Sequence, residues 1–187
     1  MYNLEKIVAF ILLIFLLPIY VVIGLIITLT SNGPILHCSK RIGAGNKIFI
    51  MYKFRTMQID TPQLATHLMD QEKAQRYVTN VGKFLRKYSL DELPQLWNIV
   101  KGEMSFVGPR PALFNQYDLI ELRQRKNIHL LKPGLTGLAQ INGRDELTID
   151  QKVAWDKKYL ENKGLFFDLK IIGKTIIYGF SGGGVKH

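Results

Sequence analysis

Hydrophobic and polar positions divide the chain into an apolar start, a mixed centre and an amphipathic end. Residues 7–29 carry no charge, and a helix of that length can cross a hydrocarbon core of about 30 Å. Pro18 lies near the middle, where the missing N–H and the ring predict a kink. A secretory signal would have a shorter apolar core and a small-residue cleavage site. We therefore predict that residues 1–31 form a retained membrane anchor, as either a kinked span or a helix that turns back.

The remaining residues, 32–187, predict one catalytic domain with few strands. Residues 47–56 are rich in β-branched and aromatic side chains, which favours a strand or one arm of a β-hairpin. Thr148 and Gln151 have the spacing of a capping box that opens a helix, and Gly164 is a suitable stop.

The last apolar stretch, residues 165–180, is interrupted by Asp168, Lys170 and Lys174. This pattern favours a helix lying in the membrane interface, with a buried core helix as the alternative. Together these segments predict an α+β, mainly helical fold with a small β-hairpin and amphipathic interfacial helices.

Charge and composition restrict the classes of partner. The formal net charge of +10 indicates anionic partners, which include acidic lipids and phosphorylated substrates. The sequence contains no nucleic-acid motif, so we expect no nucleic-acid partner. A single cysteine, Cys38, excludes an internal disulfide, and the four histidines lack metal-ligand spacing. More basic residues follow the anchor than precede it, which predicts that the catalytic domain lies on the cytoplasmic face.

The segment 86–95 places two adjacent carboxylates, Asp91 and Glu92, among basic residues. One interpretation is structural, because Ser89 and Glu92 have the spacing of a capping box at a helix start. The other is chemical, because a carboxylate can act as a nucleophile toward phosphorus or as an oxygen ligand for a metal ion. This segment alone leaves both open.

Two later loops favour phosphate chemistry. Arg110 stands between Pro109 and Pro111, which hold the backbone stiff and present a guanidinium fork suited to phosphate oxygens. A plain rigid turn is the alternative. Residues 132–144 contain several glycines and end in Arg144, so backbone amides could approach an anion closely. Carboxylates, cations and an anchor together predict phosphate chemistry at a lipid surface with Mg²⁺, or Mn²⁺, as the divalent ion.

At these residues the sequence resembles the bacterial sugar transferase family, the monotopic phosphoglycosyl transferases, in their minimal catalytic form. The resemblance extends over nearly the whole chain. It rests on five ordered motifs, Lys40-Arg41-Ile-Gly, Tyr52-Lys-Phe-Arg-Thr-Met57, Arg86-x-x-Ser-Leu-Asp-Glu-Leu-Pro-Gln-Leu-Trp-Asn98, Lys101-Gly-Glu-Met-Ser-Phe-Val-Gly-Pro-Arg-Pro111 and Lys132-Pro-Gly-Leu-Thr-Gly-Leu-Ala-Gln-Ile-Asn-Gly-Arg144.

The resemblance implies a two-step transfer in the bacterial cytoplasmic membrane. Asp91 would attack the β-phosphorus of a UDP-sugar and release UMP, and undecaprenyl phosphate would then accept the sugar phosphate. Glu92 would help Asp91 to hold Mg²⁺ and orient the reacting groups. The family's anchor is a reentrant helix broken at a Ser-Pro pair, where this chain has Leu17-Pro18. The basic residues of the motifs would bind phosphate or substrate, namely Arg86, Arg110, Arg144, Lys53, Arg55 and Arg41.

Two other functions are compatible with the same features. A membrane-bound lipid diphosphate hydrolase would share the anchor, the basic surface and the metal, but would use water as the acceptor. A non-catalytic scaffold would use its lysines and arginines only to bind acidic lipids. No motif identifies the sugar or distinguishes a monomer from a homo-oligomer.

Overall fold

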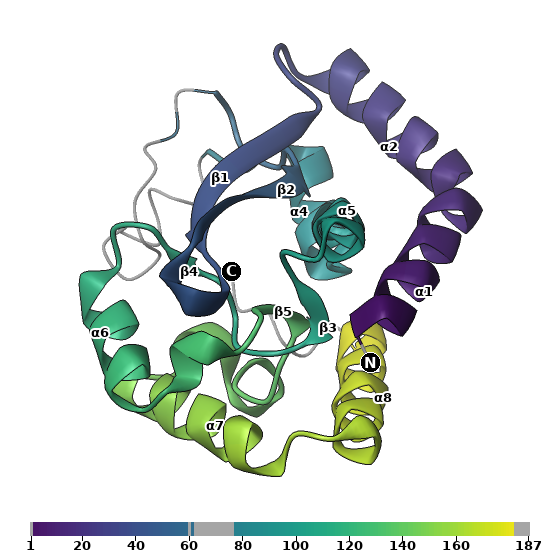
Figure 1. Ribbon diagram of the computed structural model, residues 1–187. Coiled ribbons are helices and arrows are strands. Elements are labelled where there is room, and N and C mark those ends of the chain that lie inside the picture. Colours follow the sequence, from purple (N-terminus) through teal and green to yellow (C-terminus); the bar gives the residue numbers. More distant parts are fainter. Residues whose placement is uncertain (1, 60, 62–76, 182–187) are drawn as a thin grey trace.

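The computed structural model describes residues 2–59, 61 and 77–181 (Figure 1). Parts of the predicted domain 32–187, namely residues 60, 62–76 and 182–187, lie outside the described residues. Helices predominate over two small sheets, which confirms the predicted α+β, mainly helical class. The longer helices are α1 (Tyr2–Phe15), α2 (Leu17–Thr30), α4 (Asn80–Lys87), α5 (Gln95–Lys101), α6 (Tyr117–Arg125), α7 (Ile149–Asn162) and α8 (Leu165–Ser181).

The N-terminal segment is a bent pair of helices rather than one helix. Helices α1 and α2 meet at Leu16 with a bend of 60°. Pro18 lies in the first turn of α2, where it needs no hydrogen-bond partner for its nitrogen. The predicted kink is confirmed, although the break itself precedes the proline by two residues. No described helix is alone long and apolar enough to cross a membrane, whereas this pair meets that test together.

Both ends of the helix pair contact the rest of the domain. Near its start, the Ser105 hydroxyl donates a hydrogen bond to the Glu5 carboxylate at 2.5 Å. At its end, the Arg55 guanidinium donates to the Ser31 and Asn32 carbonyls at 2.8 and 2.7 Å. Helices α1 and α2 form an arc along one side of the domain in Figure 1. Between the two contacts this arc carries many exposed large apolar side chains, with Phe15 78% exposed.

The predicted hairpin is present as two antiparallel strands, β1 (Leu36–Ile42) and β2 (Ile48–Phe54). The turn between them contains the short 3₁₀ helix η1 (Ala44–Asn46), in which Gly45 adopts a φ of 65°. Strand β4 (Ala112–Leu113) pairs with the other edge of β1, so β2 is an edge strand. Helix α5 covers this edge through the fully buried Asn98, whose amide bonds the β2 backbone.

A second sheet precedes the segments that contain Arg110 and Arg144. Strands β3 (Ser105–Val107) and β5 (Gly134–Thr136) pair in parallel, with Ser105 opposite Gly134. The residues after β3 form the Pro-Arg-Pro loop. The remaining short elements are the 3₁₀ helices η3 (Leu90–Glu92), η4 (Ile128–Leu130), η5 (Gln140–Asn142) and η6 (Arg144–Glu146).

The C-terminal helices complete the core. Helix α7 begins with the predicted capping box, in which Thr148 and Gln151 satisfy each other's backbone N–H groups. Its buried face joins α6, η4, β3 and α8 in the largest apolar cluster. Helix α8 covers the predicted stretch 165–180, burying Ile171 while Phe166 is 87% exposed. Helix α8 is therefore buried on one face only, which excludes the alternative of a fully buried core helix.

Candidate active site

The dyad lies in a tight turn that leads into α5. Asp91 and Glu92 belong to η3, and both side chains are buried. Ser89 just before them adopts a left-handed conformation, with a φ of 54°, and its side chain makes no capping hydrogen bond. The capping-box interpretation of Ser89 and Glu92 is therefore wrong. Local helix stability does not explain why two carboxylates are buried here.

Glu92 is held by three cationic side chains at a single oxygen. Lys53 Nζ, Arg110 Nη1 and Arg144 Nη2 lie 2.6, 3.3 and 3.8 Å from Glu92 Oε1. Burial acts to raise the pKa of Glu92, but the fields of these cations outweigh it and hold the pKa well below its usual range. Glu92 is thus a fixed anion that organises the cations around it.

Asp91 is held more loosely than Glu92. Its one ion pair within the described part of the chain is with Lys53, at 3.7 Å, and its carboxylate accepts no hydrogen bond there. Burial raises the pKa of Asp91, the Lys53 charge opposes this effect, and the neighbouring Glu92 charge adds to it. A buried, weakly solvated carboxylate of this kind is more basic than an exposed aspartate and suits attack on phosphorus.

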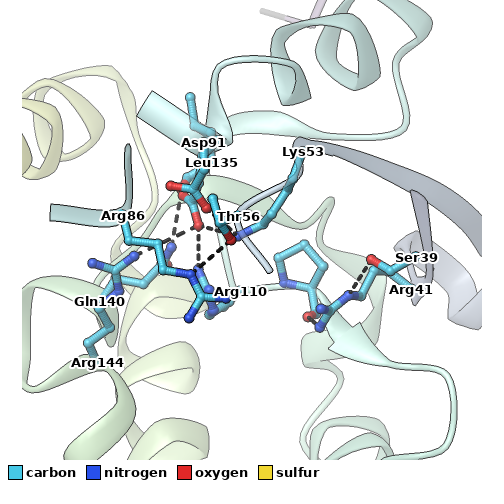
Figure 2. Close-up of polar contacts among 12 residues, drawn as sticks. Ser39, Arg41, Lys53, Thr56, Arg86, Asp91, Arg110, Leu135, Gln140 and Arg144 are labelled. Atoms are coloured by element: carbon cyan, nitrogen blue, oxygen red, sulfur yellow. Dashed lines mark hydrogen bonds and ion pairs between the residues drawn. The ribbon is translucent and has the colours of Figure 1, made fainter. Parts of the chain in front are cut away.

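Five of the six basic residues predicted to bind phosphate or substrate lie around the dyad (Figure 2). They come from different elements, and the fold brings together what the sequence separates. Lys53 extends from β2, Arg41 from β1 and Arg86 from α4, while Arg110 lies in the loop after β3 and Arg144 is the first residue of η6. Arg86 donates to Thr56 Oγ1 at 2.9 Å, which directs its guanidinium along the site.

Arg41 lies on the far side of Lys53 from Arg86 in Figure 2. Its guanidinium makes two long hydrogen bonds of 3.3 Å, to the Ser39 hydroxyl and to the Pro111 carbonyl. Burial and the nearby Arg110 lower the pKa of Arg41 to about 10. A desolvated guanidinium without a carboxylate partner among the described residues is suited to binding an incoming anion.

Arg55, the sixth of these residues, has other partners. Its guanidinium is buried against the end of α2, where it donates to two backbone carbonyls and to the Ser31 hydroxyl. A cation at a helix C-terminus stabilises the carbonyls left unpaired there. Its position in the structure is that of a helix cap, and none of its hydrogen bonds to described residues involves Asp91 or Glu92.

His37 lies opposite Lys53 in the hairpin, a position that the sequence did not indicate. In the β1–β2 register His37 is paired with Lys53, so the two side chains project from the same face. Desolvation and the fields of Arg41, Lys53 and Arg86 lower the pKa of His37. Only the register reveals this position, because the spacing of histidines along the chain carries no signal.

Comparison with known proteins identifies the family. A family model described as bacterial sugar transferase matches residues 3–182. The chain belongs to the bacterial sugar transferase family. This confirms the resemblance seen in the five motifs.

Individual relatives agree with this assignment. Galactosyl transferase CpsE of Streptococcus agalactiae serotype III (strain NEM316) is 37% identical over 166 residues, covering 83% of this chain and 37% of its own length. A UDP-glucose:undecaprenyl-phosphate glucose-1-phosphate transferase of Klebsiella pneumoniae is 39% identical over 183 residues, covering 94% and 39%. The uncharacterized sugar transferase EpsL of Bacillus subtilis (strain 168) is 39% identical over 151 residues, covering 81% and 72%. The chain thus spans 37–39% of two of these relatives and 72% of the third.

Proposed function

We propose that this protein transfers a sugar-1-phosphate from a UDP-sugar to undecaprenyl phosphate, forming undecaprenyl diphosphate sugar and UMP. The observation that carries this proposal is the contrast within the dyad. Glu92 is fixed by three cations, whereas Asp91 beside it is buried and only loosely paired. The family and the name of the Klebsiella pneumoniae relative support the same reaction.

The chemistry proceeds in two displacements at one phosphorus. An Asp91 oxygen attacks the β-phosphorus of the donor, an O–P bond forms, and the bond from this phosphorus to the bridging oxygen breaks. UMP leaves with the electron pair. A phosphate oxygen of the acceptor then attacks the same phosphorus and releases Asp91. The surrounding cations stabilise negative charge on the oxygens in both steps.

We infer that part of the acceptor's hydrocarbon chain binds in an apolar groove that ends at Leu90. One face of α2, one face of α4 and Leu90 line this groove, which has a volume of about 620 Å³. Leu90 immediately precedes Asp91, so the phosphate end of a prenyl chain in the groove would lie near the nucleophile. Ile26→Trp should raise the KM for undecaprenyl phosphate and leave UMP release in the first step intact. Leu25→Trp, at an exposed neighbour outside the groove, is the control, and equal effects of both changes would exclude the groove.

The anchor is proposed to be reentrant in the bacterial inner membrane, with the catalytic domain on the cytoplasmic face. Contacts of both Glu5 and Ser31 with the same domain support this topology, because a spanning helix would separate its two ends by the membrane. The exposed apolar side chains between them, and the exposed Phe166 of α8, would then face lipid. Asn3→Cys in a Cys38→Ser background, needed because Cys38 is exposed, tests this topology with an impermeant label in sealed vesicles. Labelling only from the periplasmic side would exclude it.

Mg²⁺, with Mn²⁺ as an alternative, is proposed as the cofactor. Among the described residues no three acidic, histidine or cysteine side chains form a metal cluster. The dyad nevertheless fits an ion shared with substrate. All three cations approach Glu92 Oε1, so among the described residues Glu92 Oε2 has no ion pair and could bind an ion together with the Asp91 carboxylate. Mg²⁺ in proteins commonly combines one or two carboxylates with substrate phosphates, whose charge it offsets when bound.

The decisive experiment measures both products from a panel of UDP-sugars supplied with undecaprenyl phosphate. We expect UMP and a lipid-linked sugar diphosphate from the wild type and neither from Asp91→Asn. Asp150→Asn, at an exposed acid in the first turn of α7, should behave as the wild type. Sugar phosphate released into water without a lipid product would instead indicate the hydrolase. Full activity of Asp91→Asn would exclude Asp91 as the nucleophile, and lipid binding without turnover would indicate the scaffold.

A further inference from the structure

A second buried ion pair lies behind the Pro-Arg-Pro loop. Arg123 of α6 donates from Nε and Nη2 to the same oxygen, Asp156 Oδ2 of α7, at 3.0 and 2.7 Å. Asp156 is 1% exposed and Arg123 9%. The third nitrogen of the guanidinium, Nη1, donates at 2.9 Å to the backbone carbonyl of Arg110. One planar group therefore joins a buried carboxylate to the loop that carries an active-site arginine.

Fold stability alone does not account for this pair. Removing two charges from water is costly, and well-packed apolar residues of similar size are often as stabilising as a buried ion pair. Burial raises the pKa of Asp156, with the Arg123 charge opposing it, which reflects that cost. What apolar residues could not supply is a fixed N–H donor directed at the Arg110 carbonyl.

The loop is held at three successive carbonyls by three different elements. The Pro109 carbonyl accepts from the Gly134 amide at 3.0 Å, the Arg110 carbonyl from Arg123, and the Pro111 carbonyl from Arg41 at 3.3 Å. The two prolines fix their own φ angles but leave the orientation of the intervening peptide groups to such contacts. The Arg123 bond is the one made directly to the residue whose side chain reaches Glu92.

We propose that Arg123 and Asp156 form a positioning pair for Arg110, which sets the direction of its guanidinium toward Glu92 and the substrate phosphate. The proposal rests on the transferase function proposed above. Asp156 fixes the plane of the Arg123 guanidinium, Arg123 fixes the Arg110 carbonyl, and the Arg110 side chain then leaves the loop toward the dyad. A displacement of about 1 Å in such a group can lower a rate by roughly 100-fold.

Arg123→Lys tests this without removing the charge that Asp156 needs. An ammonium can pair with Asp156 but cannot extend a planar fork to both acceptors. We expect kcat/KM for UMP release to fall by about 10- to 100-fold. Arg125→Met, an exposed position on the same helix that pairs with Glu121, should stay within about 2-fold, since surface pairs contribute little.

A double-mutant cycle separates positioning from a general structural effect. In an Arg110→Ala background, Arg123→Lys should cause no further loss of kcat/KM, because the two residues act as one unit. The proposal would be overturned if Arg123→Lys lowered kcat/KM equally in the wild-type and Arg110→Ala backgrounds. Full activity of Arg123→Lys would overturn it as well. If Arg123→Lys does not fold, the apolar pair Arg123→Met with Asp156→Leu replaces it. That variant should melt near the wild-type temperature yet show the same loss, and full activity would again overturn the proposal.

Failure of the underlying function gives a different result. The wild type would then release no UMP from any UDP-sugar. In that case the cycle is measured through the Kd for UMP. A loss of UMP affinity on Arg123→Lys that disappears in the Arg110→Ala background supports the positioning pair. An equal loss of affinity in both backgrounds rejects it.

Discussion

Replacing Asn98 with leucine should destabilise the strand that carries Lys53. Asn98 is fully buried at the free edge of β2, where it accepts from the Tyr52 N–H at 3.2 Å. It donates to the Ile50 carbonyl and to Glu103, both at 2.7 Å. Leucine leaves the two backbone groups without partners in the interior, and each such group costs about 1–3 kcal/mol. Glu103 also loses its hydrogen bond from Asn98, but it retains its ion pair with Lys101. The loss of the Glu103 bond therefore destabilises the protein less than the loss of the two backbone bonds. We expect a loss of about 3 kcal/mol.

For a chain of this size, that loss lowers the melting temperature by roughly 6–12 °C. Thermal unfolding of the detergent-solubilised protein, followed by tryptophan fluorescence, measures it. Asn98→Asp should not restore stability, because a carboxylate cannot donate to the Ile50 carbonyl. The control is Asn162→Leu, at an exposed helix end where the amide bonds only the Lys158 carbonyl. A decrease of less than about 2 °C for Asn98→Leu would refute the reasoning, because two unpaired buried groups cost more than that.

Three further predictions concern the surroundings of the site. Gly82→Ala should lower both the melting temperature and the rate of UMP release, because a Cβ there meets the Thr56 carbonyl and forces α4 outward. The control is Gly173→Ala, which has open space around it and should change neither quantity. Arg55→Met should lower stability by about 2–4 kcal/mol through loss of charge-assisted hydrogen bonds to the end of α2, and an unchanged melting temperature would contradict this. The His37 ring should titrate below its ordinary pKa of 6.5 in a proton NMR titration. Because the unfolded chain then binds the proton more readily, stability should fall as the pH drops below about 6.5. Bound UMP, an anion, should raise the midpoint of the His37 titration.

Local patterns predicted those features that depend on neighbours in sequence. The kink near Pro18 and the Thr148 capping box follow from residues within one turn of each other, and both are present. The Ser89 capping box failed although its spacing was equally good, because Ser89 adopts a left-handed conformation that turns the chain into the site. A spacing rule cannot detect that tertiary requirement.

Functions of single arginines depend on distant partners and could not be predicted. Arg55 and Arg110 both stand in motifs, yet Arg55 binds backbone carbonyls at a helix end and Arg110 binds Glu92. A guanidinium is suited to both tasks. The same limit hid Arg123, whose partner Asp156 lies 33 residues further along the chain.

Glu5 and Ser31 attach the two ends of the helix pair to the rest of the protein, and this has a consequence for biosynthesis. The two attachments of the apolar helices are completed by residues made at very different times. Ser31 can meet Arg55 soon after both emerge, whereas Glu5 must wait for Ser105, 100 positions later. During that interval the pair is attached to the rest of the protein at one end only, with its large apolar side chains still exposed. With the topology proposed above, insertion would precede folding of the catalytic domain, and changes at Ser105 should act late, after the helices have entered the bilayer.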